Sequence, residues 1–235
     1  MLEVIALNVH DAQEAVAGGA DRVELVGTMR EDGLAPEPEL VEQVARIIRV
    51  RPMLRIQGGW APGSIARLAD LARQYYEAGA EGVVLGFMKG GTGDGESAGE
   101  GDGEQRGAAE LDMKLAQQLT QGRPYTLHRV IDHAPDYAAA WRALLEAHHS
   151  PDVVLTAGSP KGVTAGLPTL RELIAREPRA AALIQAGGGL RKEHVPQLLD
   201  FGVRAFHVGS PVRLNGSFDA PVGAALVQAW ARLAK

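Results

Sequence analysis

Short apolar runs alternate with longer segments of helical periodicity along the whole chain. The run DRVELV (21–26) is rich in residues that favour strands, and the later segment PELVEQVARIIRV (38–50) has apolar residues at helical spacing. The alternation continues to the C-terminus, with glycines at the ends of several helical segments. We expect strands at 2–7, 21–26, 53–57, 81–87, 125–129, 152–156, 181–186 and 204–208. We expect helices at 10–17, 38–50, 64–78, 108–119, 138–148, 167–176, 191–200 and 221–234.

Strict alternation of strands and helices indicates parallel strands joined by crossover helices. Eight such units in 235 residues match an α/β fold, a single (β/α)8 TIM-like barrel that spans residues 1–235. A doubly wound open sheet is the alternative, but the central strands of such a sheet are more uniformly apolar. Polar residues inside the predicted strands favour a barrel with a ligand-facing mouth. These residues are Glu24, Arg55, His128 and His207.

One segment, GGTGDGESAGEGDGEQRG (90–107), interrupts this rhythm between the fourth strand and its helix. Its glycine-rich and acidic composition offers too little apolar surface to offset the entropy of ordering. We therefore predict a flexible surface insertion within the single domain rather than a domain boundary. Because the segment starts at the end of the barrel where active sites lie, a mobile lid is the functional alternative.

The composition is ordinary for a globular protein and narrows the range of partners. Net charge is −5, hydrophobic residues make up 46% of the chain, and cysteine is absent. The acidic balance argues against nucleic acid as a partner, and no window approaches the roughly 18 unbroken apolar residues of a membrane helix. The N-terminal sequence MLEVIALNVHDAQ lacks the basic start of a signal peptide. We expect a cytoplasmic protein with no membrane partner, no disulfides and no cysteine nucleophile.

Catalytic groups of TIM barrels lie on the loops that follow the strands. The stretch YTLHRVID (125–132) places a base and an acid there, and its alternation points His128 into the mouth, where Asp132 would orient or charge it. Glu24 and Arg55 lie on neighbouring strands and are expected to meet inside, where Arg55 would present its planar donors to an anion. A buried ion pair or a hydrogen-bonded rim are the structural alternatives. The candidate catalytic residues are Glu24, Arg55, His128 and Asp132.

Polar and glycine-rich turns follow the last three strands, in TAGSPKG (156–162), AGGGL (186–190) and HVGSPVR (207–213). Backbone N–H groups in such turns bind anions, and many barrels hold a phosphate between loops seven and eight. A glycine run also simply makes a tight turn. We expect a small anionic ligand here. The candidate ligand-binding residues are Arg129, Thr156, Gly187, Gly188, Gly189, His207 and Ser210.

Several motifs, in their order and spacing, resemble the CutC family of copper homeostasis proteins. They are DRVELVGTMREDGLAP, LRIQGGW, TLHRVID, LTAGSPKG, QAGGGLR and AFHVGS. The resemblance covers nearly the whole chain, and the first and third of these motifs are its most specific parts. It implies a TIM-like barrel, a cytoplasmic location, self-association as a dimer or tetramer, and a link to copper handling.

The chain departs from the family pattern at residues that bear on copper. Val26 stands where the family commonly has a cysteine, and Gln57 stands where an R-P-R-G-G unit has its second arginine. Copper(I) prefers thiolate or thioether ligands, and the five methionines form no metal-binding pattern. Copper is therefore a cofactor by resemblance only, its ligands are unknown, and these residues do not favour direct copper binding.

Three functions are open on the sequence alone. The first is a CutC-like protein whose barrel mouth binds a small anion. The second is a phosphate-binding barrel enzyme of the isomerase or lyase type, in which His128 and Glu24 carry out acid–base chemistry. The third is a metal-binding module, in which histidines such as His128 and His207 bind copper(II) or zinc.

Overall fold

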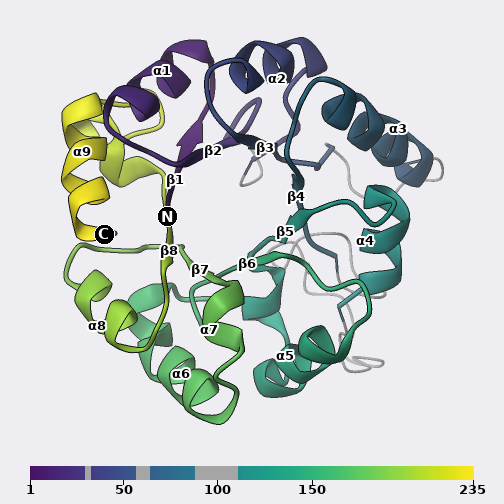
Figure 1. The fold of residues 1–235 in the computed structure, drawn as a ribbon, viewed down its shortest axis with the longest axis vertical. Coiled ribbons are helices and arrows are strands. Elements are labelled where there is room, and N and C mark those ends of the chain that lie inside the picture. The colour runs from purple at the N-terminus through teal and green to yellow at the C-terminus, as the bar shows by residue number, and fades with distance from the viewer. Residues whose placement is uncertain (30–32, 57–63, 88–110) are drawn as a thin grey trace, which may run out of the picture.

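A computed structural model describes residues 1–29, 33–56, 64–87 and 111–235. Parallel strands form a ring in the order β3-β2-β1-β8-β7-β6-β5-β4, and a parallel bridge between Met53 and Val84 joins its two ends. Figure 1 shows the ring with helices around its outside. The fold is the (β/α)8 TIM barrel that the alternation predicts. The strands are β1 (Leu2–Ala6), β2 (Arg22–Leu25), β3 (Val50–Pro52), β4 (Val83–Leu85), β5 (Tyr125–Leu127), β6 (Val153–Thr156), β7 (Ile184–Ala186) and β8 (Ala205–Val208).

The helices surround the barrel in chain order. Several begin at a side chain that accepts a hydrogen bond from the first turn, as Asn8, Asp112 and Asp136 do. Short 3-10 helices follow two of the strands, η2 (Arg129–His133) after β5 and η3 (Ser210–Val212) after β8, with η4 (Leu214–Gly216) next. The α-helices are α1 (Val9–Ala17), α2 (Pro38–Ala45), α3 (Ser64–Glu77), α4 (Met113–Thr120), α5 (Tyr137–Glu146), α6 (Val163–Arg176), α7 (Ala180–Leu183), α8 (His194–Asp200) and α9 (Ala224–Leu233).

The third unit differs from the sequence prediction. We predicted a strand at 53–57, but β3 is Val50–Pro52, and α2 ends at Ala45 instead of continuing to residue 50. Arg51 lies on β3 and is buried, although arginine is an unlikely residue for a barrel interior. The interior accommodates Arg51 because it supplies acidic and hydroxyl partners.

Several other boundaries shift by two to four residues, and one prediction cannot be compared. The segment 181–186 starts within α7 and becomes strand only at Ile184, and β5 stops at Leu127, so that His128 and Arg129 belong to the loop end. The shift at β5 places these two residues after the strand, in the mouth of the barrel. The predicted insertion at 90–107 lies outside the described residues.

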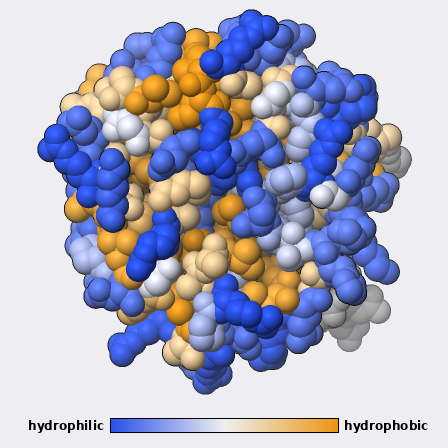
Figure 2. Space-filling model, viewed as in Figure 1, coloured by the Kyte–Doolittle hydropathy of each residue, from blue (hydrophilic) through white to orange (hydrophobic). Residues whose placement is uncertain are grey.

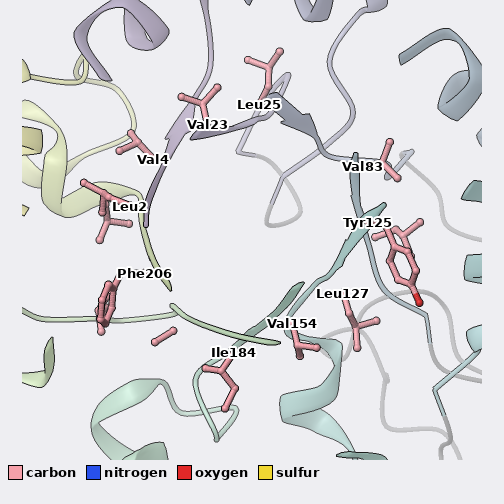
Figure 3. Packing of buried hydrophobic residues seen from close by; sticks show 14 of the residues in the cluster. Leu2, Val4, Val23, Leu25, Val83, Tyr125, Leu127, Val154, Ile184 and Phe206 are labelled. Atoms are coloured by element: carbon pink, nitrogen blue, oxygen red, sulfur yellow. The ribbon is translucent and has the colours of Figure 1, made fainter. Parts of the chain in front are cut away.

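The main hydrophobic core lies between the strands and the helices. Figure 3 shows Val23, Leu25, Leu127 and Val154 pointing away from the barrel axis toward the surrounding helices. A separate, smaller apolar cluster contains Ile5, Val26, Met53 and Val84. Because strand side chains alternate, the residues between the outward apolar ones point into the barrel. The sequence pattern thus gives an apolar outer layer and a mixed interior.

A network of buried charges fills the N-terminal part of the interior. Arg51 donates to Thr126 Oγ1 at 2.8 Å and pairs with Glu81 and Asp152. Arg22 pairs with Glu81 at 2.8 Å, so one carboxylate joins the two arginines. Buried charges are stable only when paired in this way. The network fixes the inward-facing side chains on β2 and β3.

The outer surface is mixed in polarity. Figure 2 shows hydrophilic residues over much of the periphery, with hydrophobic residues in separate groups between them. Such a surface is expected of amphipathic helices whose apolar faces pack on the barrel. Among the described residues, no helix is long and apolar enough to cross a membrane.

Candidate functional site

A cavity of about 320 Å³ opens at the C-terminal ends of the strands. Residues after β5, β7 and β8 line it, which is the end where barrels of this kind bind ligands. The structure brings most of the predicted site residues together on its walls. They are Glu24, Arg55, His128, Arg129, Gly188, Gly189, His207 and Ser210. The predicted residues outside the lining are Asp132, Thr156 and Gly187.

Glu24 is the buried acid of the cavity. It lies on β2 with only 2% of its surface exposed, opposite Ile5 on β1. Within the described chain, its Oε2 atom is buried without a hydrogen-bond partner. Burial raises the pKa of Glu24 to about 7 against the opposing charges of His207 and Arg55. A carboxyl group in this state exchanges its proton near neutral pH.

His207 lies beside Glu24 and is oriented by Glu3. The β1–β8 register puts Glu3 opposite His207, and His207 Nδ1 lies 2.8 Å from Glu3 Oε1. Because an ionised carboxylate only accepts, Nδ1 is the nitrogen that carries the proton in this bond. One side-chain oxygen or nitrogen atom from each of Glu3, Glu24 and His207 lies within 4.8 Å of the other two. These three side chains therefore form one titrating cluster.

The charges in this cluster are set by its neighbours. Burial favours neutral Glu3, but Arg22 and His207 outweigh it and lower the pKa of Glu3 well below its usual range. Arg22 Nε donates to Glu3 at 2.5 Å, and Gln185 Nε2 donates at 2.8 Å. Burial lowers the pKa of His207, but the Glu24 and Glu3 carboxylates raise it by more, so that the net shift is upward. Glu3 therefore stays ionised, while the pKa values of Glu24 and His207 are both raised.

Glu3 was not among the residues predicted for the site. The signal was present in the strand LEVIA, where Glu3 has the same parity as inward-facing Ile5 and lies opposite Arg22 and His207. Finding it required the strand register, which the sequence pattern alone does not provide.

Arg129 forms a rigid cationic wall of the cavity. Its Nε donates to Asp132 at 2.9 Å, and its Nη2 donates to the carbonyls of Ser159 and Pro160 at 3.3 Å. Within the described residues, Nη1 has no hydrogen-bond partner. Gly188 has a φ of +86°, and a Cβ there would lie 2.6 Å from Arg129 Cζ, so the guanidinium packs against the glycine. Arg129 is thus held in place, and within the described residues its Nη1 group remains available to a ligand.

His128 lines the same cavity, but Asp132 does not orient it as we predicted. Asp132 accepts from Thr156 Oγ1 at 2.5 Å and from the N–H groups of Ala157 and Gly158. Its carboxylate therefore anchors the end of β6. Burial, followed by the charge of Arg55, holds the pKa of His128 well below its usual range. His128 is neutral at physiological pH, and can donate or accept a hydrogen bond there.

Apolar side chains complete the cavity, among them Met29, Leu155 and Phe218. Phe218 is held in place by Arg213, whose Cζ lies 4.9 Å from the ring centroid. Arg213 is itself buried and pairs with Asp11 at 2.7 Å. Neither residue was predicted, because their approach depends on a loop that returns across the barrel end.

Comparison with known proteins agrees with this architecture. The CutC family model matches residues 1–211. The chain belongs to the CutC family. A CutC family protein of Erwinia tasmaniensis is 29% identical over 223 residues, which cover 92% of this chain and 81% of the relative. A CutC family protein of Salmonella paratyphi B is 30% identical over 222 residues, which cover 91% and 81%.

Solved structures share the barrel. A copper homeostasis protein CutC from Streptococcus agalactiae superposes with a TM-score of 0.70 at 19% identity, covering 89% of this chain and 97% of that one. A thiamine phosphate pyrophosphorylase from Pyrococcus furiosus reaches 0.57 at 17% identity, covering 99% and 96%. At these identities the superpositions show a common fold.

Proposed function

We propose that this CutC family member binds a small anionic metabolite in the barrel mouth and transfers protons to and from it. The observation that carries the proposal is the buried Glu24 carboxylate, which lines the cavity and has one oxygen without a hydrogen-bond partner among the residues described. A buried polar atom without a partner costs free energy, and such costs are common where a ligand or a reaction uses the group.

The residues around Glu24 suit general acid–base catalysis. Its pKa of about 7 lets it accept a proton from a C–H or O–H group of the ligand and later return it. His207 faces the same cluster with Glu3 behind it, and this arrangement stabilises negative charge that develops on the ligand. His128, kept neutral, is a second hydrogen-bonding group for the ligand.

The charge of the cavity favours an anion. Arg55 and Arg129 both line it, and Arg129 is held by bonds from Nε and Nη2, with no partner for Nη1 in the described part of the chain. Arginine donors in a partly desolvated pocket bind carboxylates and phosphates strongly. The basic residues of the mouth thus contrast with the acidic net charge of the whole chain.

Solvent exchange tests this proposal. Purified protein is incubated in D₂O with a panel of small carboxylated and phosphorylated metabolites, and proton NMR follows the loss of C–H signals. We expect one metabolite class to exchange with wild type, and the rate to fall at least about a hundredfold in Glu24→Gln. Exchange that is unchanged in Glu24→Gln, or absent for every anion in the panel, would reject the proposal.

Copper binding is the second candidate function, and one observation favours it. The thioether of Met29 lines the same cavity as His128, His133 and His207, and thioether and imidazole groups both bind copper. Cysteine ligands are absent from the chain. Copper would therefore be a cargo held by Met29 and imidazoles rather than by thiolates.

A competition titration separates this candidate from the first. Wild type, Met29→Leu and the surface variant His148→Gln are titrated with Cu(I) against a chromophoric chelator. Copper handling in the mouth predicts that Met29→Leu weakens binding while His148→Gln does not. Equal affinity in wild type and Met29→Leu would show that Met29 does not bind copper and would reject this candidate.

A further inference from the structure

We infer that the anion bound in the mouth is the phosphate group of a small phosphorylated metabolite, held by the turns after β7 and β8 together with Arg129. This inference rests on the proposed function and names its substrate class. Gly188 and Gly189 follow β7, Gly209 and Ser210 follow β8, and all four line the cavity.

Four backbone donors at these turns are unused. Within the described chain, the N–H groups of Gly188, Gly189, Gly209 and Ser210 donate to no hydrogen bond. Strands β7 and β8 are neighbours in the barrel, so the two pairs of donors lie at adjacent strand ends. Unpaired backbone N–H groups in turns at the ends of neighbouring strands are suited to bind an anion.

The turn after β7 is held in a fixed conformation. Gly188 and Gly189 have φ values of +86° and +68°, and the Gly188 carbonyl accepts from Val163 N–H at 2.9 Å. The Gly187 N–H is already bonded to the Thr156 carbonyl at 3.1 Å, so it supports the turn from behind. The donors are thus positioned before a ligand arrives, which lowers the entropy cost of binding.

Close packing against neighbouring side chains requires glycine at two positions in these turns. A Cβ at Gly209 would lie 2.7 Å from the Phe218 ring and 2.8 Å from Ile5, and one at Gly188 would collide with Arg129. Arg129 adds a guanidinium whose Nη1 has no hydrogen-bond partner among the described residues. Several donors from different directions match the three terminal oxygens of a phosphate better than the two oxygens of a carboxylate.

The unpaired Glu24 oxygen belongs to the same cavity and supplies the second contact. A ligand with its phosphate at the β7 and β8 turns would extend its reacting atoms toward Glu24 and His207. The cavity volume of about 320 Å³ is at the small end for ligand sites. A small phosphorylated metabolite fits this volume better than a nucleotide does.

Calorimetry with inorganic phosphate tests the inference on the full chain. We expect wild type to bind phosphate and to bind acetate much more weakly. Arg129→Gln should weaken phosphate binding about tenfold or more, whereas Arg123→Gln, which removes the same charge before β5, should bind like wild type. Arg129→Lys keeps a charge beside Asp132 and removes the planar fork, so it serves as a second variant if Arg129→Gln fails to fold. It should also weaken binding.

Three outcomes would overturn the phosphate assignment: no phosphate binding, equal binding by Arg129→Gln and wild type, or acetate binding as tight as phosphate. The test is independent of catalysis. Phosphate binding without Glu24-dependent deuterium exchange would support this site while rejecting the proposed function. Exchange on a non-phosphorylated anion without phosphate binding would do the reverse.

Discussion

Glu24 and His207 depend on each other for their protonation states. Among the neighbouring charges, Glu24 has the largest effect in raising the pKa of His207. In turn, His207 has the largest effect in opposing the rise of the Glu24 pKa. The two groups therefore titrate as a pair, and each observed pKa belongs to the pair and not to one residue. Glu3, kept ionised by Arg22, decides which nitrogen of His207 carries the bound proton. The Glu3 carboxylate therefore affects the protonation of both Glu24 and His207.

Replacing Glu24 by glutamine should make the protein more stable at alkaline pH. The folded-state pKa of about 7 lies above the ordinary 4.5, so the folded protein binds this proton more tightly than the unfolded chain. Wild type then loses stability as pH rises from 4.5 through 7, and the full difference is about 3 kcal/mol. His207 offsets part of it, so we predict a gain of about 1–3 kcal/mol for Glu24→Gln at pH 8.

Urea denaturation at pH 5 and pH 8 measures this difference. At pH 5 the two proteins should have nearly equal free energies of unfolding, because Glu24 is protonated in the folded wild type. An advantage of Glu24→Gln that is as large at pH 5 as at pH 8 would show that ionisation of Glu24 is not its cause.

Replacing Glu3 by glutamine should have the opposite effect. The substitution leaves the buried guanidinium of Arg22 without its closest carboxylate, 2.5 Å away, although Glu81 still pairs with it. Loss of one partner from a buried ion pair costs about 3–5 kcal/mol. Urea denaturation should show a loss in this range for Glu3→Gln. A control, Glu42→Gln, removes an exposed pair with Arg46 and should change stability by less than about 1 kcal/mol.

At the scale of elements, the end of β6 connects a helix to the cavity wall. Asp132 in η2 accepts from the backbone after β6 and also holds Arg129. Helix α6 packs closely behind it, where a Cβ at Gly166 would lie 1.8 Å from the Ala157 carbonyl oxygen. The position of Arg129 thus depends on how closely α6 approaches the barrel.

Gly166→Ala should therefore destabilise the protein despite the better helix propensity of alanine. The methyl group must displace the backbone after β6, and overpacking of this kind costs about 3 kcal/mol, more than the roughly 1 kcal/mol that alanine gains in a helix. The matched variant Ala165→Gly, on the exposed side of α6, should lose only about 1 kcal/mol. Urea denaturation of both compares them, and a Gly166→Ala protein as stable as wild type would contradict this packing.

Whether a strand was predicted correctly depends on how its side chains are buried. Strands such as β2 and β8 were predicted to within one residue of each end, because their outward side chains are apolar and alternate with polar ones. The prediction of β3 failed, because Arg51 is buried by partners from elsewhere in the chain, Thr126 on β5 and Glu81 before β4. Contacts between residues that are distant in the sequence cannot be predicted from the local hydrophobic pattern.

At the scale of the whole molecule, the barrel brings distant parts of the sequence to one mouth. Polar residues mark the C-terminal ends of several strands in the sequence, so His128, His207 and Ser210 were expected at one end of the barrel, and all three line the same cavity as Glu24. The role of Asp132 in holding β6 and the place of Glu3 behind His207 could not be predicted, since both depend on side-chain directions across the barrel.

The central claim is that a buried carboxyl group in this mouth exchanges its proton near neutral pH. Carbon NMR of protein labelled at the glutamate carboxyl carbons measures it directly, by titration of wild type and Glu24→Gln. We predict one glutamate resonance in wild type with a midpoint near pH 7, missing from Glu24→Gln. If every glutamate in wild type titrates below about pH 5.5, within the usual range for this group, the account of the mouth as an acid–base site is wrong.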